Sequence, residues 1–224
     1  MAGHVLILGA PGAGKGTQAS RLTEKHGWAH ISTGDIFRGH QERGTDFGEK
    51  IGSYLKAGEL VPDGLTCEVV VDRLSQPDCN QGYILDGFPR SVAQAEELDR
   101  MLEQRDEALD AVIVLEIGDE EIVERLTARR TCPECGKIYN LTFEPPAVEG
   151  VCDNETCGGA TLDQREDDRE DTIRQRLRVY HESTEPLIAY YMERGLVRSI
   201  EAAGQGPSAI AEKIEDILLA QGVS

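Results

Sequence analysis

The sequence predicts an α/β protein in which helices flank a parallel β-sheet. Two observations predict this fold. Short apolar runs rich in β-branched residues or leucine alternate with longer amphipathic segments, as in sheets whose strands are joined by crossover helices. A glycine-rich turn ending in a lysine follows the first apolar run, at a strand-to-helix junction where such sheets bind anions.

The predicted elements follow in order along the chain. Four runs are expected to be strands, at residues 5–8, 83–85, 111–115 and 197–200. Helical periodicity occupies 15–26, 63–74, 91–104, 119–130, 170–194 and 207–220. Two stretches interrupt the alternation. Residues 32–65 contain short helices and glycines without a strand, and residues 131–163 contain four cysteines and short β-prone pieces such as 137–143. We interpret both as insertions on the core.

Length and composition exclude several classes of protein. A chain of 224 residues can bury a full core, either as one domain with insertions or as two small domains. Its hydrophobic content of 39% is ordinary, and no run approaches the roughly 18 apolar residues of a membrane span. The first four residues lead directly into a strand, so no signal peptide is expected. We therefore expect a cytoplasmic protein with no membrane partner.

The charge is unusually acidic. The net charge is −18, with 41 Asp and Glu, and only six of the 23 basic residues are Lys. A Lys-poor acidic surface keeps a protein soluble in concentrated salt, where self-repulsion is screened over a few ångströms. We hypothesise a halophilic protein from a salt-rich cytoplasm; the alternative is an ordinary acidic protein. Nucleic-acid binding is not expected, because it requires a basic surface.

The glycine-rich turn, GAPGAGKGTQ at 9–18, predicts a phosphate-binding loop. Its glycines allow successive N–H groups to converge on an anion, the following helix contributes its positive end, and Lys15 adds a full charge. The strict P-loop pattern has Ser or Thr where this chain has Gly16, and Thr17 stands one position late. The alternative is a glycine-rich turn that binds no ligand.

The cysteines predict a metal site. Cys132 and Cys135 are separated from Cys152 and Cys157 by 16 residues, and both pair spacings suit a tetrahedral structural zinc site. Disulfides are not expected in a reducing cytosol. An insertion with few large apolar groups would obtain its folding free energy from the metal. Glu155 also has a suitable spacing from Cys152 and could replace Cys157 as a ligand. The two other cysteines, Cys67 and Cys79, are expected to pack in the core.

A second anion-binding element is expected after the strand at 83–85. Asp86 follows this strand at the sheet edge where ligands of α/β proteins bind, and it could organise Mg²⁺ and its waters. Arg90 could bind a phosphate in a bidentate manner. The alternative is a surface turn with a salt bridge.

Further arginines gather around the second insertion. Arg125 and Arg129 are expected on one face of one helix, and Arg165 and Arg176 are expected to align if a single helix includes both. A solvated charged face is the usual explanation of such spacing. A chain this acidic has little reason to cluster arginines without an anion, and phosphoryl transfer requires such clamps.

Taken together, these motifs closely match one family. The chain resembles an adenylate kinase of the long-lid type over nearly its whole length. The shared segments are GAPGAGKGTQ at 9–18, STGD at 32–35, KAGELVPD at 56–63, LDGFPR at 85–90, the arginine pairs, and REDDREDTIRQRL at 165–177. The resemblance implies reversible phosphoryl transfer from Mg·ATP to AMP, giving two ADP, by a monomer. It also implies a P-loop core (1–31, 66–127 and 165–224), a nucleotide-monophosphate (NMP)-binding insertion (32–65) and a zinc-bearing, β-rich lid (128–164).

The resemblance also implies residue roles. ATP would be bound by Gly12, Ala13, Gly14, Lys15, Gly16, Thr17, Arg125, Arg129, Ile138 and Tyr139. AMP would be bound by Thr33, Arg38, Glu59, Leu60, Val61, Gly87, Phe88, Pro89, Arg90 and Gln94, with Arg165 and Arg176 bridging the phosphates of both nucleotides. Lys15 and the arginines at 90, 129, 165 and 176 would offset the charge that develops in transfer. The family tolerates glycine at position 16, because Mg²⁺ is held largely through water and nucleotide oxygens.

Two features differ from the common pattern of these kinases. The second cysteine pair encloses four residues where long lids commonly enclose two, and the segment 201–207, expected near the donor adenine, carries an extra residue. Two alternative functions also remain open. One is another nucleoside-monophosphate kinase or a GTP:AMP phosphotransferase, since base selectivity depends on a few contacts. The other is a zinc-ribbon binding module that merely carries a nucleotide fold.

Overall fold

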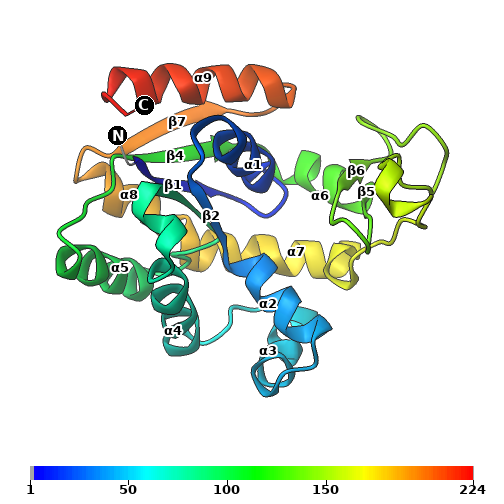
Figure 1. Cartoon of the computed structure of the whole chain (residues 1–224), viewed down its shortest axis with the longest axis horizontal. Coiled ribbons are helices and arrows are strands. Elements are labelled where there is room, and N and C mark those ends of the chain that lie inside the picture. The colour runs from blue at the N-terminus through cyan, green and yellow to red at the C-terminus, as the bar shows by residue number, and fades with distance from the viewer. Residues whose placement is uncertain (1–2, 224) are drawn as a thin grey trace.

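Five parallel strands form the central sheet of the protein. The computed structural model describes residues 3–223, and Figure 1 shows the sheet between two layers of helices. The strand order is β2-β3-β1-β4-β7. The strands are β1 (Gly3–Gly9), β2 (Ala29–Ser32), β3 (Gly82–Asp86), β4 (Ala111–Glu116) and β7 (Val197–Glu201). The four predicted strands are confirmed. The prediction missed β2, a four-residue edge strand whose alternating His30 and Ser32 give no apolar run.

Helices cover both faces of this sheet. On one face α1 (Lys15–His26) and α9 (Pro207–Ala220) pack against β1 and β4, around Ile7, Leu22 and Ile214. On the other face lie α4 (Asp63–Leu74), α5 (Val92–Gln104) and α8 (Pro186–Met192), with the short 3₁₀ helix η1 (Pro77–Gln81) leading into β3. Cys79 is fully buried and Cys67 partly buried in this second cluster, as predicted. The two layers fix the position of the carboxyl edge of the sheet.

A third apolar cluster joins two helices to the start of the glycine-rich loop. It unites Ala10 with residues of α6 (Asp119–Thr127) and α7 (Glu170–Val179). The predicted helix 170–194 is not continuous. The π turn η4 (Tyr180–Thr184) separates α7 from α8, and the 3₁₀ turn η3 (Glu166–Asp168) precedes α7.

The first insertion is helical, as predicted. It consists of α2 (Thr33–Glu42) and α3 (Asp46–Ala57), and it projects from the core at the bottom of Figure 1. The hydroxyls of Ser32 and Thr45 accept hydrogen bonds from backbone N–H groups in the first turns of these helices. Phe37, Ile51 and Val61 form a small apolar cluster of their own.

The second insertion contains an antiparallel pair of strands, β5 (Arg129–Thr131) and β6 (Ile138–Asn140), and the 3₁₀ turn η2 (Glu155–Cys157). It projects at the right of Figure 1. The predicted helix 119–130 is wrong at its end: α6 stops at Thr127, and Arg129 instead pairs with Asn140 in β5. Backbone hydrogen bonds with β6 therefore replace the last helical turn. Among residues 3–223, no helix has both the length and the apolar composition needed to cross a membrane.

Candidate active site

A large cavity of about 1410 Å³ lies at the carboxyl edge of the sheet, between the core and the two insertions. Its wall includes the glycine-rich loop, the turn after β3, the start of α2, parts of β5 and β6, and α7. Ile7 of β1 lies beside Asp86 of β3 in the sheet register, so the two loops that follow these strands are neighbours. The parallel topology thus brings distant sequence motifs to one site.

The glycine-rich loop encloses the ammonium group of Lys15. Gly14 precedes α1 with a φ of 96°, a left-handed conformation that favours glycine. Lys15 Nζ donates hydrogen bonds to the carbonyls of Gly9 (2.8 Å) and Ala10 (2.9 Å). Desolvation in the loop lowers the pKa of Lys15 to about 8; Asp86 opposes this shift, and the surrounding arginines reinforce it. An anion bound in the loop would therefore restore the charge of this lysine.

Asp86 is buried at the end of β3, where its carboxylate contacts His30 of β2, with Nε2 and Oδ2 3.2 Å apart. A side chain at position 16 would extend toward the same carboxylate, since a Cβ there would lie 3.4 Å from Asp86 Oδ2. Glycine at position 16 therefore leaves the space between the loop and Asp86 open. The geometry gives a physical reason for this departure from the strict P-loop pattern.

The turn after β3 holds Arg90 against the cavity. Arg90 Nε donates to the carbonyl of Gly87 (2.7 Å), which also accepts from the Thr33 hydroxyl (2.7 Å). Gly87 has a φ of 78°, and a Cβ there would lie 2.8 Å from Arg90 Nη2. No other residue fits this position without displacing the guanidinium. Burial lowers the pKa of Arg90 to about 10, and Arg176 adds to this effect.

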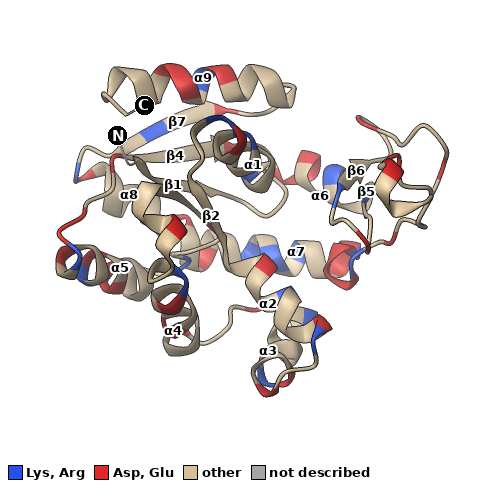
Figure 2. Cartoon of the chain, viewed as in Figure 1, with Lys and Arg blue, Asp and Glu red and all other residues tan. Residues whose placement is uncertain are grey.

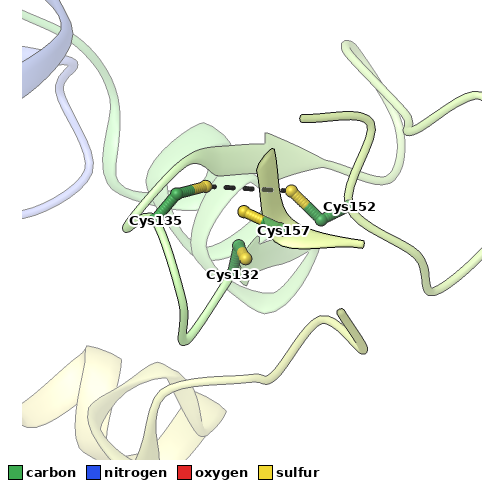
Figure 3. A group of neighbouring side chains, drawn as sticks. All are labelled: Cys132, Cys135, Cys152 and Cys157. Atoms are coloured by element: carbon green, nitrogen blue, oxygen red, sulfur yellow. Dashed lines mark hydrogen bonds between the residues drawn. The ribbon is translucent and has the colours of Figure 1, made fainter. Parts of the chain in front are cut away.

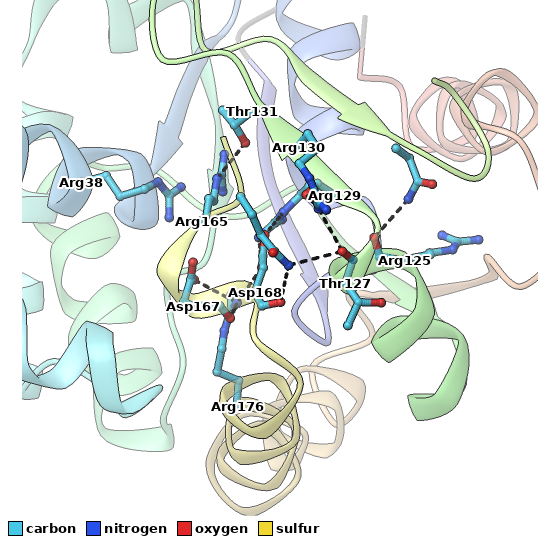
Figure 4. Close-up of polar contacts among 12 residues, drawn as sticks. Arg38, Arg125, Thr127, Arg129, Arg130, Thr131, Arg165, Asp167, Asp168 and Arg176 are labelled. Atoms are coloured by element: carbon cyan, nitrogen blue, oxygen red, sulfur yellow. Dashed lines mark hydrogen bonds and ion pairs between the residues drawn. The ribbon is translucent and has the colours of Figure 1, made fainter. Parts of the chain in front are cut away.

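Two aspartates of η3 pair with arginines of the cavity wall (Figure 4). Arg129 donates from Nε to Asp168 Oδ2 (2.7 Å) and from Nη2 to Oδ1 (2.6 Å), and the Asp168 side chain is fully buried. Arg176 Nη1 lies 2.9 Å from Asp167 Oδ2. Burial raises the pKa of Asp167, but Arg176 and its neighbouring arginines outweigh burial and leave that pKa below its usual value. The two carboxylates therefore balance the charges of Arg129 and Arg176.

The helical alignment predicted for Arg125 and Arg129 is wrong, and the condition for aligning Arg165 with Arg176, a single helix that includes both, is not met. Arg129 lies in β5 and Arg125 in α6, and Arg165 precedes η3, whereas Arg176 lies in α7. All four nevertheless line the cavity, because the chain reverses between these elements. Arg165 Nε donates to the Thr131 hydroxyl (3.2 Å), and burial lowers the pKa of Arg165 to about 10 with a further contribution from Arg129.

The predicted nucleotide-binding residues line this cavity, with one exception. Phe88 is fully buried in the apolar cluster behind the turn, so its side chain packs instead of facing the cavity. The structure adds residues that sequence reasoning missed. These are Glu121, Phe143, Asp167 and Thr184, all in the cavity wall, and Asp168 behind it. The acidic run between Arg165 and Arg176 was the available signal for the two aspartates.

Arg125 connects α6 to the segment after β7. Its Nη2 donates to Glu121 Oε1 (2.6 Å) and to the carbonyl of Ala202 (3.3 Å). The same Glu121 oxygen accepts weakly from Gly204 N (3.4 Å). The segment 201–207, which sequence reasoning left without assigned contacts, thus brings residues 204–207 into the cavity wall beside Arg125.

The four cysteines of the second insertion converge, as Figure 3 shows. Their Sγ atoms all lie within 4.8 Å of one another, and those of Cys135 and Cys152 are 3.8 Å apart. Four thiolates bound tetrahedrally to one Zn²⁺ stand about 3.8 Å apart, given a Zn–S bond of about 2.3 Å. Glu155 is not a member of this group. The donor set therefore fits a zinc ion held by thiolates alone.

The parallel sheet, the glycine-rich loop after β1 and the arginine-lined cavity define the class of P-loop kinases. The comparisons specify the family within this class. A family model described as adenylate kinase matches residues 7–196, and the chain belongs to the adenylate kinase family.

Several relatives of similar length carry the same name. An adenylate kinase from Archaeoglobus fulgidus is 49% identical over 95% of this chain and 99% of its own length. One from Thermodesulfovibrio yellowstonii is 52% identical over 90% of this chain and 92% of its own. One from Caldicellulosiruptor bescii is 47% identical over 98% of this chain and 99% of its own.

Proposed function

We propose that this protein transfers a phosphoryl group reversibly from Mg·ATP to AMP, giving two ADP. One observation carries this proposal: Lys15 and the arginines at 90, 129, 165 and 176 converge on one cavity large enough for two nucleotides. Phosphoryl transfer requires little covalent chemistry from the protein. It requires two anions positioned in line and the neutralisation of the charge on the transferred group.

The donor is proposed to lie against the glycine-rich loop. Backbone N–H groups of residues 12–17 would bind its phosphates, with Lys15 moving from the carbonyls of Gly9 and Ala10 to the phosphate oxygens. Arg125 and Arg129 would contact the donor from α6 and β5. Ile138 and Tyr139 would lie near its base and ribose. Asp86 would orient the waters of the Mg²⁺ that accompanies ATP.

The acceptor is proposed to lie between the turn after β3 and the first insertion. That part of the cavity is lined by Thr33, Arg38, Arg90 and Gln94, with residues 59–61 and the turn residues Gly87 and Pro89. Arg38 pairs with Asp35 and can exchange this partner for a phosphate. Arg165 and Arg176 would bridge the two nucleotides across the transferred group.

The chain is proposed to work as three parts: a P-loop core (1–31, 66–127 and 165–224), an NMP-binding insertion (32–65) and a lid (128–164). Closure of both insertions over the cavity would exclude water, which would otherwise hydrolyse ATP. Zn²⁺ held by Cys132, Cys135, Cys152 and Cys157 would supply the stability that the small lid cluster of Cys132, Tyr139, Cys152 and Leu162 does not.

We further propose a monomeric enzyme of a salt-rich cytoplasm. Figure 2 shows acidic residues on α5, α7 and α9, while basic segments of α7 and β5 border the cavity. The net charge of the chain is −18. An acidic surface favours solubility at high ionic strength.

The test is an assay of ADP formation from ATP and AMP. We expect Lys15→Met to abolish transfer while its circular dichroism spectrum stays that of the wild type. Turnover that survives this substitution would refute the role of Lys15. Replacing AMP by other monophosphates, and ATP by GTP, measures base selectivity in the same assay. A protein that binds nucleotide but forms no ADP would instead be a binding module.

A further inference from the structure

The long helical segment after the lid contains one turn that is wider than an α-helical turn. Glu185 N donates to the carbonyl of Tyr180 (2.9 Å), which is an i→i+5 hydrogen bond within η4. Helices with this bonding pattern occur mostly as single turns inside α-helices, frequently at functional sites. Pro186 follows immediately and has no N–H to donate, so α8 restarts after this turn.

The extra residue of the π turn changes the direction in which the side chain of Thr184, the last residue of η4, points. In a continuous α-helix, residues eight apart differ by about 80° around the axis, at about 100° per residue. One extra residue in a turn subtracts about 100° from this angle, so that residues eight apart end about 20° from each other in the opposite sense. Thr184 therefore stays on the same helical face as Arg176, and both line the cavity.

On this face the Thr184 hydroxyl reaches the turn after β3. Thr184 Oγ1 donates to the carbonyl of Arg90 (2.9 Å), and the Thr184 residue is 8% exposed. The amide of Arg90 is held as well, because its N–H donates to Gln94 Oε1 (2.7 Å). Both backbone polar groups of Arg90 are thus bound by side chains from two different helices. The guanidinium is left to bind Gly87 O or a ligand.

We propose that Thr184 is a positioning residue for phosphoryl transfer: the π turn aims its hydroxyl at the Arg90 carbonyl and thereby fixes Arg90 relative to Arg176. This inference rests on the proposed function of Arg90. A small displacement of a catalytic group costs far more in rate than in binding, because transfer requires aligned reactants. Loss of the hydroxyl should therefore lower kcat more than it raises KM.

The test compares Thr184→Val, which keeps the shape and removes the donor, with Thr184→Ser, which keeps the donor. We expect Thr184→Val to lower kcat about tenfold and to change KM for AMP, the nucleotide that Arg90 is proposed to bind, less than about twofold. Thr184→Ser should recover most of the rate. Thr23→Val is the matched control, because the Thr23 hydroxyl on α1 is buried and has no hydrogen-bond partner within the described residues. Its kcat should equal that of the wild type.

The Arg90→Lys background separates this inference from the proposed function. If Thr184 acts through Arg90, Thr184→Val should lower kcat by less than about twofold further in that background. An equal tenfold loss there, or wild-type kcat in the single Thr184→Val variant, would overturn the inference. Wild-type kcat in Arg90→Lys alone would instead refute the proposed role of Arg90 and this inference with it. If Thr184→Val does not fold, Thr184→Ala carries the same comparisons.

Discussion

Arg129 and Asp168 form a two-pronged ion pair behind the cavity, with both hydrogen bonds at 2.7 Å or less and the carboxylate fully buried. Asp168 also lies 3.5 Å from Arg176. One carboxylate therefore helps to balance the charges of two guanidinium groups that would otherwise repel each other. It also holds the two groups in a fixed geometry. A buried carboxylate with such partners is costly to remove.

Substituting Asp168 should therefore destabilise the folded protein and also lower its rate of phosphoryl transfer. We expect Asp168→Asn to lower the free energy of unfolding by about 3 kcal/mol, because Arg129 loses its charged partner and Arg176 keeps only Asp167. Urea unfolding would measure the loss. Glu120→Gln is the matched control, because it breaks an ion pair with Arg174 whose partners are both exposed. A comparable loss in both variants would contradict a special role for Asp168.

ATP binding should be linked to proton uptake at alkaline pH. The pKa of Lys15 is lowered to about 8 in the free protein, and bound phosphates would raise it again. ATP binding therefore takes up a proton at pH values between the pKa of Lys15 in the free protein and its pKa in the complex. We expect uptake of about three-quarters of a proton at pH 8.5 and about a tenth at pH 7. Affinity should fall as pH rises above 8.

Calorimetric titration in two buffers of different ionisation enthalpy would measure this uptake. Lys15→Arg is the control, since a guanidinium stays protonated throughout this range and should show no linked uptake above pH 8. Equal uptake by the wild type and Lys15→Arg would assign the proton to another group.

Removal of zinc should loosen the lid before the core. The lid contains only a small apolar cluster around Cys132, Tyr139, Cys152 and Leu162, so the metal would supply most of its stability. After chelation we expect amide exchange to accelerate in residues 128–164 while β1 and β4 stay protected. Unchanged exchange in the lid would argue against a structural metal.

The ligand set can be tested separately by metal content. Cys157→Ser should lose bound zinc, whereas Glu155→Gln should retain about one zinc per chain, because Glu155 is not a member of the cysteine group. The opposite result would assign the fourth ligand to Glu155.

Stability should rise with salt. Screening of a net charge of −18 weakens self-repulsion in the folded state, so potassium chloride at about 2 M should raise Tm by a few degrees relative to about 0.1 M. Replacing the exposed Glu96, Glu103 and Glu212 by Gln should reduce this salt dependence. Equal melting temperatures at both salt concentrations would contradict the halophilic hypothesis.

Local patterns made much of this structure predictable. The apolar run at 111–115 and the periodicity at 15–26 each specify their element, because strand and helix periods are properties of a short segment. Predictions failed where pairing with a distant segment decided the outcome. Arg129 continues a helical pattern locally, yet hydrogen bonding with Asn140 places it in a strand. The edge strand β2 exists because β3 lies beside it.

The sequence alone determined the glycine-rich loop, the cysteine group and the acidic charge, since each depends on residue type and spacing. It also indicated the family through motifs spread over the chain. Only the tertiary structure decided which groups share one cavity and what holds them there. The pairing of Arg129 with Asp168, the contact of Thr184 with Arg90 and the convergence of Cys157 with the other three cysteines all depend on how distant or reversed segments meet. Such contacts are set by packing in three dimensions, which no local pattern encodes.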